Sequence, residues 1–199
     1  MNMDDWRIDE VLFLGFKGSR DYVHGTDIFN SCENLLNGRG LYIGALSLRK
    51  MTSSHLAITD SPISSRQTVG TVEVVGPTED KGILYLQEVR PATERRAYDE
   101  NLIADRALLI GPSASIERMI DFTVIENIVA VKKKLCYALS PIEKGKWVFA
   151  QLRLSQKLPS YFDTLTITRT SKVGSVFSKS DINIDGKLLG QIAFCVEGR

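Results

Sequence analysis

The spacing of apolar residues near the start of the chain predicts one strand followed by one helix. Residues 11–16 form a short apolar run, which is typical of a strand. Over 26–36, apolar side chains recur at steps of three and four residues and therefore share one face of a helix. Thr26 or Asp27 suits its N-cap, and the glycines of 37–40 suit its C-terminal end.

After this helix the chain alternates between apolar and polar residues, which predicts strands. Turn residues at 60–62 and 76–77 separate these strands. The four predicted strands cover 41–50, 54–59, 68–75 and 82–89. A charged segment, 91–103, comes next and is the natural linker to a second unit.

The second half of the chain predicts a similar series of elements. Residues 107–110 indicate a strand, and apolar positions over 115–139 recur at helical spacing. The following strands are predicted at 146–156, 164–170, 174–184 and 187–196. Asp185 and Gly186 join the last two strands, since Asp-Gly favours a two-residue hairpin turn.

Short stretches of the two halves also match in the same order. The matched pairs are 41–48 with 147–154, 56–59 with 165–168, and 69–72 with 173–176. Their offsets are 106, 109 and 104 residues, respectively. An internal repeat of this length, present twice, predicts a duplicated domain, with one unit at 1–90 and the other at 104–199.

One helix and several antiparallel strands, present twice, resemble the hotdog fold of acyl-thioester enzymes. Two such units in one chain resemble the double-hotdog proteins, and the resemblance covers nearly the whole sequence. It implies an α+β fold in which two tandem helix-plus-antiparallel-sheet units form one continuous sheet.

A short motif adds to this resemblance. His24 and Gly25 lead into the first helix, and Glu33 follows nine residues after the histidine. The spacing resembles the hotdog thioesterase motif, in which a second glycine usually stands where this chain has Thr26. The resemblance implies that His24 and Glu33 are catalytic. It also implies that backbone N–H groups from Gly25 and Thr26 onward stabilise the developing negative charge on the thioester carbonyl oxygen.

Each residue of this region also has a structural interpretation. His24 would then bond to loop backbone, Glu33 would be a solvated helix residue, and Asp27 would be a capping acid. Arg20 and Tyr22, in the preceding loop, are candidates for binding the substrate or a phosphopantetheine arm. Salt bridges within the loop explain these two residues equally well.

The second half has Gly-Pro-Ser-Ala-Ser at 111–115 in place of the His-Gly pair. Its predicted helix carries Asp121 and Glu126. The resemblance to hotdog dehydratases implies a split site, in which the histidine comes from one hotdog unit and the acid from the other. That arrangement would pair His24 with Asp121 or Glu126 and would leave Glu33 structural. The alternative is that both acids belong to the polar face of an amphipathic helix.

Only the first half is therefore expected to hold a working site. The second helix carries Ile120, Val124 and Ile128, which are bulky enough to fill the corresponding space in the second half. One ligand per chain is the expected stoichiometry.

Composition narrows the classes of partner. The 25 basic and 24 acidic residues give a net charge of +1, so neither nucleic acid nor an anionic membrane is expected as a partner. Cys32, Cys136 and Cys195 are widely spaced and odd in number, which argues against disulfides and a zinc site and favours a reducing compartment.

Residues 1–7 are polar, and no apolar run approaches the roughly 18 residues of a membrane span. We expect a cytoplasmic protein without a metal or cofactor, in which Lys132, Lys133 and Lys134 mark a solvated helix end.

The hotdog resemblance implies an enzyme that acts on an acyl thioester, carried by CoA or by acyl carrier protein. Thioesterase and 3-hydroxyacyl dehydratase are the two expected activities. The alternative is a non-catalytic hotdog protein that binds an acyl thioester or a partner protein. The resemblance also allows a homodimer.

Overall fold

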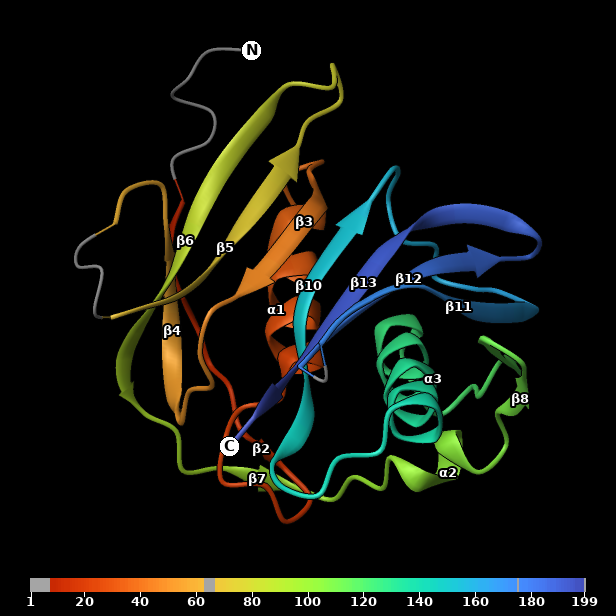
Figure 1. Ribbon diagram of the computed structural model, residues 1–199. Coiled ribbons are helices and arrows are strands. Elements are labelled where there is room, and N and C mark those ends of the chain that lie inside the picture. Colours follow the sequence, from red (N-terminus) through yellow and green to blue (C-terminus); the bar gives the residue numbers. More distant parts are fainter. Residues whose placement is uncertain (1–7, 63–66, 175, 199) are drawn as a thin grey trace. The chain divides into compact units, whose positions relative to one another are not determined.

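The computed structural model describes residues 8–62, 67–174 and 176–198, and the chain forms two compact units, Met1–Tyr98 and Asp99–Arg199. Each unit combines one long helix with an antiparallel sheet (Figure 1). Residues 1–7 and Ser175, which contributed to the sequence predictions, lie outside the described ranges. Within those ranges, no helix combines the length and the apolar character that crossing a membrane requires.

The first unit follows the predicted order of elements. Its elements are β1 (Asp9–Leu12), β2 (Phe16–Lys17), α1 (Gly25–Asn37), β3 (Tyr42–Leu48), β4 (Ser54–Thr59), β5 (Thr68–Val75), β6 (Lys81–Pro91) and β7 (Arg95–Arg96). The sheet has the order β1-β4-β6-β5-β3, and all neighbouring strands are antiparallel. β2 and β7 form a separate parallel pair, so the predicted strand at 11–16 is divided between β1 and β2.

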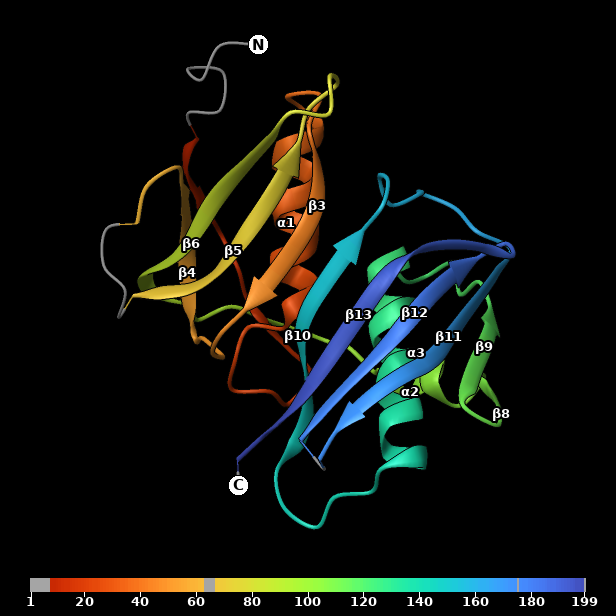
Figure 2. The same ribbon diagram turned by 45° about the horizontal axis from the view of Figure 1, so that its top comes forward.

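The helix α1 lies along one face of this sheet (Figure 2). It buries one apolar face, formed by Ile28, Phe29, Cys32 and Leu36. The sheet contributes fully buried side chains that include Leu46, Leu56, Ile58, Val72 and Leu86. Burying one large apolar side chain contributes about 1.5–3 kcal/mol, so this contact holds α1 and its N-terminal turn in place.

The second unit also contains one long helix and one sheet. Its elements are α2 (Asn101–Ala104), β8 (Leu108–Ile110), β9 (Ser113–Glu117), α3 (Val124–Leu139), β10 (Lys146–Leu154), β11 (Thr164–Val173), β12 (Phe177–Ile184) and β13 (Lys187–Glu197). The sheet order is β8-β9-β11-β12-β13-β10, again antiparallel throughout. The predicted hairpin is confirmed, because Ile184 pairs with Lys187 while Asp185 and Gly186 have φ values of 50° and 77°. Those angles suit a tight turn that follows the twist of the strands.

The predicted helix over 115–139 begins too early. Residues Ser113–Glu117 form β9, in which buried Ala114 and Ile116 alternate with partly exposed serines that bond to threonines of β11. The helix starts at Val124 because Thr123 and Glu126 form a reciprocal capping box there. Asp121 consequently lies in an exposed turn before α3 and not on the helix.

The two units connect their strands differently. In the first unit, β3 pairs with β5 and β4 pairs with β6, whereas in the second, β10 pairs with β13 and β11 pairs with β12. The matches of 41–48 with 147–154 and of 56–59 with 165–168 therefore fall on equivalent strands. The third match is wrong, because 69–72 lies in β5 whereas 173–174 ends β11 and enters a turn.

Two further predictions for the second half have mixed outcomes. Lys132 does not mark a solvated helix end: its side chain is fully buried, and Nζ lies 2.8 Å from Ser178 Oγ and 2.9 Å from Ser180 Oγ. Ile120 is 78% exposed and fills no interior space, whereas Val124 and Ile128 are buried as expected.

The segment 91–103 takes part in both units. It includes β7, which pairs with β2 in the first unit, and α2, which packs against α3 in the second. These contacts give the segment regular structure on either side of the boundary after Tyr98.

Candidate functional site

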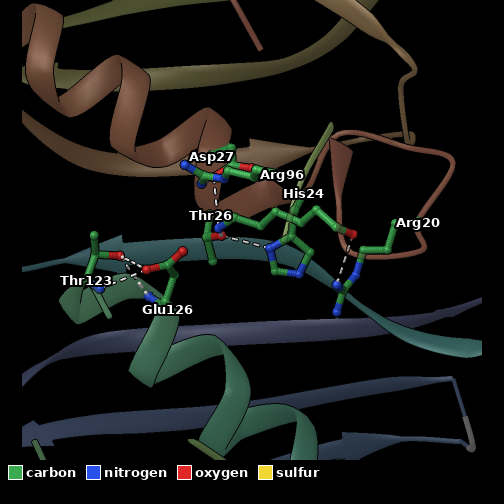
Figure 3. Close-up of polar contacts among 8 residues, drawn as sticks. Arg20, His24, Thr26, Asp27, Arg96, Thr123 and Glu126 are labelled. Carbon is green, nitrogen blue, oxygen red and sulfur yellow. Dashed lines mark hydrogen bonds and ion pairs between the residues drawn. The ribbon is translucent and has the colours of Figure 1, made fainter. Parts of the chain in front are cut away.

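His24 stands at the N-terminus of α1. Its backbone is extended, with φ −73° and ψ 138°, and its side chain makes no capping bond to the helix. Val23, just before it, is fixed by a 2.8 Å hydrogen bond from its N–H to the carbonyl oxygen of Thr52. The ring is buried, and Nδ1 lies 2.7 Å from the hydroxyl oxygen of Thr26 (Figure 3). The histidine of the predicted motif is therefore held in one orientation at the start of the helix.

A buried lysine that the sequence analysis missed supports the same turn. Lys17 is fully buried, and its Nζ donates to Thr26 Oγ1 and to Asp27 Oδ1, both at 2.8 Å. The ammonium group also lies 4.5 Å from the centre of the Tyr98 ring. A cation over an aromatic face is attracted by the ring quadrupole, so Tyr98 adds to the stabilisation that Asp27 provides.

Pairing of β2 with β7 places Lys17 there. Phe16 N–H donates to the carbonyl oxygen of Glu94 at 2.8 Å, and Gly18 N–H donates to that of Arg96 at 2.9 Å. This pairing brings together segments almost 80 residues apart in sequence. A two-residue parallel pair has no recognisable sequence pattern, so only the three-dimensional structure reveals this part of the site.

Asp27 carries the negative charge of the cluster. Its carboxylate is buried and forms ion pairs with Lys17 and with Arg96, whose side chain is 60% exposed. Figure 3 shows Arg96 beside Asp27. An acid in the first helical turn also interacts favourably with the positive end of the helix dipole. These contacts give Asp27 a structural role in the first turn of α1. The predicted N-cap, Thr26 or Asp27, is wrong, because α1 begins at Gly25 and its N-cap residue is His24.

The candidate substrate-binding residues of the preceding loop differ in their surroundings. Arg20 is half-buried, its guanidinium lies 5.4 Å from the centre of the Tyr98 ring, and it donates to the carbonyl oxygen of Lys17. Arg95 Nη1 in turn donates to the carbonyl oxygen of Arg20 at 2.7 Å. Tyr22 is half-buried. Arg20 is thus tied into the loop and lies beside Lys17 and Tyr98.

Glu33 lies on α1 but not beside the imidazole. Nine residues along an α-helix correspond to about two and a half turns, so the two positions point in opposite directions and lie roughly 13 Å apart along the axis. The half-buried Glu33 and His24 are therefore separated within the first unit. The neighbouring Cys32 is fully buried, and burial raises its pKa to about 12, which keeps it an unreactive thiol.

The two acids predicted for the second helix have different environments. Asp121 is exposed in the turn before α3. Glu126 is buried, and its Oε2 accepts from Thr123 N–H at 2.8 Å and from Thr123 Oγ1 at 2.9 Å (Figure 3). The capping box gives Glu126 a structural role at the start of α3, and Asp121 stays a predicted acid of the second unit.

The other histidine serves the fold. His55 is buried on β4, and its Nδ1 accepts a hydrogen bond from Leu14 N–H at 3.0 Å. Phe13 packs edge-on against its ring, with centroids 5.6 Å apart. Because Nδ1 accepts, the ring proton of neutral His55 resides on Nε2.

The first turn of α1 determines which chemistry the site can support. The first N–H groups of a helix have no intrahelical acceptor and lie at the positive end of the helix dipole. Gly25 and Thr26 supply two such groups directly after His24. This combination of backbone donors and a fixed imidazole suits the stabilisation of an oxyanion and the transfer of a proton.

No protein-family model matches this chain, and the search of curated proteins found no match either. Solved structures do resemble it. The pyran synthase domain from module nine of the sorangicin pathway has a TM-score of 0.50 and 10% identity, covering 96% of this chain and 92% of that domain.

Two other solved structures align over similar fractions of this chain and of their own length. A tesB protein from Mycobacterium avium subs paratuberculosis has a TM-score of 0.49 and 10% identity, over 98% of this chain and 94% of that protein. The dehydratase domain of PpsC from Mycobacterium tuberculosis, in complex with C12:1-CoA, has a TM-score of 0.46 and 10% identity, over 96% of this chain and 91% of that domain.

Proposed function

We propose that this chain, which has the hotdog fold, acts on an acyl thioester as a thioesterase or a 3-hydroxyacyl dehydratase. The observation that supports the proposal best is the position of His24. Its imidazole is buried at the N-terminus of α1, is held by Thr26 and makes no side-chain capping bond.

Both reactions place the same demand on the protein. Thioester hydrolysis and 3-hydroxyacyl dehydration each build negative charge on the thioester carbonyl oxygen. The N–H groups of Gly25 and Thr26 are the proposed donors to that oxygen. His24 is the proposed partner of the reacting group through Nε2, since its Nδ1 is already bonded to Thr26.

A carboxylate completes the proposed chemistry. It takes up or delivers the proton that each reaction moves, a role worth about 10²–10⁴-fold in rate. Glu33 on α1 and Asp121 before α3 are the two candidates. The substrate is carried by CoA or by acyl carrier protein, and Arg20 and Tyr22 are proposed to contact its phosphopantetheine arm.

One observation favours a second candidate function. The group bonded to Nδ1 of His24 is the hydroxyl of Thr26, whereas a carboxylate there would strengthen the imidazole as a base. A protein that binds an acyl thioester without converting it would tolerate this arrangement. This second candidate is a non-catalytic binding protein.

Turnover of a panel of acyl-CoA and acyl-carrier-protein substrates separates the candidates. Release of free thiol identifies a thioesterase, and a gain or loss of water, measured by mass spectrometry, identifies a hydratase or dehydratase. The matched variants are His24→Ala, expected to lose turnover, and His55→Ala, expected to retain it at temperatures where the protein is folded. Saturable binding in calorimetry without turnover of any substrate would support the binding protein instead.

A further inference from the structure

We infer that Lys17 is a positioning residue for His24, acting through Thr26 to hold the imidazole neutral with its proton on Nε2. The inference deepens the proposed function and rests on it. It gives His24 the role of a hydrogen-bond donor to the substrate, and it leaves proton removal to the carboxylate.

The burial of Lys17 calls for an explanation beyond folding. Its ammonium group is fully buried, and removing such a charge from water is unfavourable before its contacts are counted. It also lies at the N-terminus of α1, where the helix dipole disfavours a cation. Asp27 does not require Lys17 for neutralisation, because Arg96 already forms an ion pair with the same carboxylate.

The direction of the hydrogen bonds sets the protonation of His24. An ammonium group only donates, so Thr26 Oγ1 is the acceptor in its 2.8 Å bond with Lys17. The single hydroxyl proton of Thr26 is then directed to its other close neighbour, Nδ1 of His24, at 2.7 Å. An imidazole that accepts at Nδ1 carries its proton on Nε2 and presents an N–H donor.

The surrounding charges keep the ring neutral. Three positive charges lie around this turn, from Lys17 in β2, Arg96 in β7 and Arg20 in the loop between β2 and α1. Asp27 adds one negative charge. Tyr98, 6.0 Å from the imidazole between ring centres, is an uncharged neighbour. A positive charge on the imidazole would be repelled by this net positive group of side chains, which disfavours the imidazolium form.

Nuclear magnetic resonance of the full chain, with ¹⁵N-labelled histidine, tests the inference without any substrate. The chain has two histidines, and His55 is an internal reference because Leu14 N–H fixes its proton on Nε2. The wild type should show His24 in the same tautomer. In Lys17→Met, the midpoint for protonation of His24 should rise by about one pH unit, while that of His55 stays in place.

Thr26 variants separate positioning from packing. Thr26→Val keeps the volume and the Lys17–Asp27 ion pair but removes the bridging hydroxyl, so His24 should become a mixture of tautomers. Thr26→Ser should restore the single tautomer. With an active substrate, the acidic limb of the kcat/KM profile should move to higher pH together with the midpoint in Lys17→Met. The profile should also change in Thr26→Val and should keep its wild-type position in Thr26→Ser.

The outcomes distinguish this inference from the proposed function. An inactive wild type that still shows the Lys17 and Thr26 effects on the ring would reject the proposed function and retain the coupling. An active wild type in which Thr26→Val leaves the tautomer and the pH profile as they were would overturn the positioning role. If Lys17→Met fails to fold, the Thr26 pair decides alone.

Discussion

Gly70 and Gly190 occupy equivalent places in the two sheets. A Cβ atom on Gly70 would lie 2.2 Å from the carbonyl oxygen of Ser47, and one on Gly190 would lie 2.0 Å from that of Arg153. Ser47 and Arg153 correspond in the first sequence match between the two halves. In both units, a strand that follows the helix therefore approaches its neighbour too closely to tolerate any side chain.

Substitution of either glycine should destabilise its unit. Gly70→Ala and Gly190→Ala each place a methyl group against backbone, which cannot move aside as a flexible side chain would. We expect each to lower the free energy of unfolding by about 2 kcal/mol or more, measured by urea denaturation. Gly38→Ala is the control, because Gly38 has a helical φ of −61° and its nearest neighbour would be 3.6 Å away. It should change stability by about 0.5 kcal/mol or less, and a comparable loss in all three would refute the close-approach explanation.

Substitution of Asp27 should destabilise the protein more than substitution of its ion-pair partner Arg96. Asp27→Asn removes the carboxylate and leaves the Lys17 ammonium buried without its counter-charge, which should cost about 3–5 kcal/mol of unfolding free energy. Arg96→Ala removes a side chain that is 60% exposed, so the loss should be about 0–1 kcal/mol. Chemical denaturation of the two variants provides the comparison. Equal losses would mean that Arg96, and not Lys17, is the partner that matters for Asp27.

Elements whose period is unambiguous could be predicted from the sequence. The apolar face of α1 repeats at three and four residues, and the Asp185-Gly186 turn has a specific chemistry, so both were correctly placed. The start of α3 was not, because buried Ala114 and Ile116 are compatible with either period until their pairing with β11 is known. Tertiary pairing decided the structure of that segment.

The strand connectivity of the second unit and the burial of Lys17 and Lys132 could not be predicted. Gly174 matches Gly70 in the sequence, yet it lies in a turn with φ 55°, and Gly190 is the structural counterpart. Lys17 and Lys132 look like ordinary surface lysines, since nothing in their neighbouring residues indicates burial. Their partners come from distant strands or helices, and these contacts exist only in the folded chain.

Lys132 should give the protein a measurable dependence of stability on pH. Burial lowers the pKa of Lys132 below its usual value of 10.5, so the folded chain releases this proton at a lower pH than the unfolded chain does. Between the lowered pKa and 10.5, the unfolded state binds more protons, and the stability of the folded state rises with pH. The difference in unfolding free energy between the wild type and Lys132→Met should therefore shift in favour of the wild type over this range. A difference that stays constant with pH would show that Lys132 is not desolvated.

The three cysteines should differ in reactivity. Burial raises the pKa of Cys32 to about 12 and also raises that of Cys136, and both side chains are almost inaccessible. Cys195 is only half-buried, although burial and the nearby Glu197 raise its pKa as well. A thiol reagent should label the native protein slowly, at Cys195, and faster as the pH rises, because the thiolate is the reactive form. Cys195→Ser should prevent labelling under native conditions, and rapid modification of Cys32 would contradict its described burial.

The two candidate acids can be separated by charge-removing substitutions that preserve shape. Glu33→Gln tests a site in which the helix of the histidine also supplies the acid, and Asp121→Asn tests the split arrangement. The acid that transfers the proton should lose about 10²–10⁴-fold in kcat on the best substrate of the panel, while the other variant should stay close to wild type. Asp105→Asn is the matched control for Asp121, because Asp105 is likewise an exposed acid in a turn of the second unit. If Glu33→Gln and Asp121→Asn both retain full activity while His24→Ala is inactive, neither carboxylate is the proton carrier, and His24 must act with a different acid or with water.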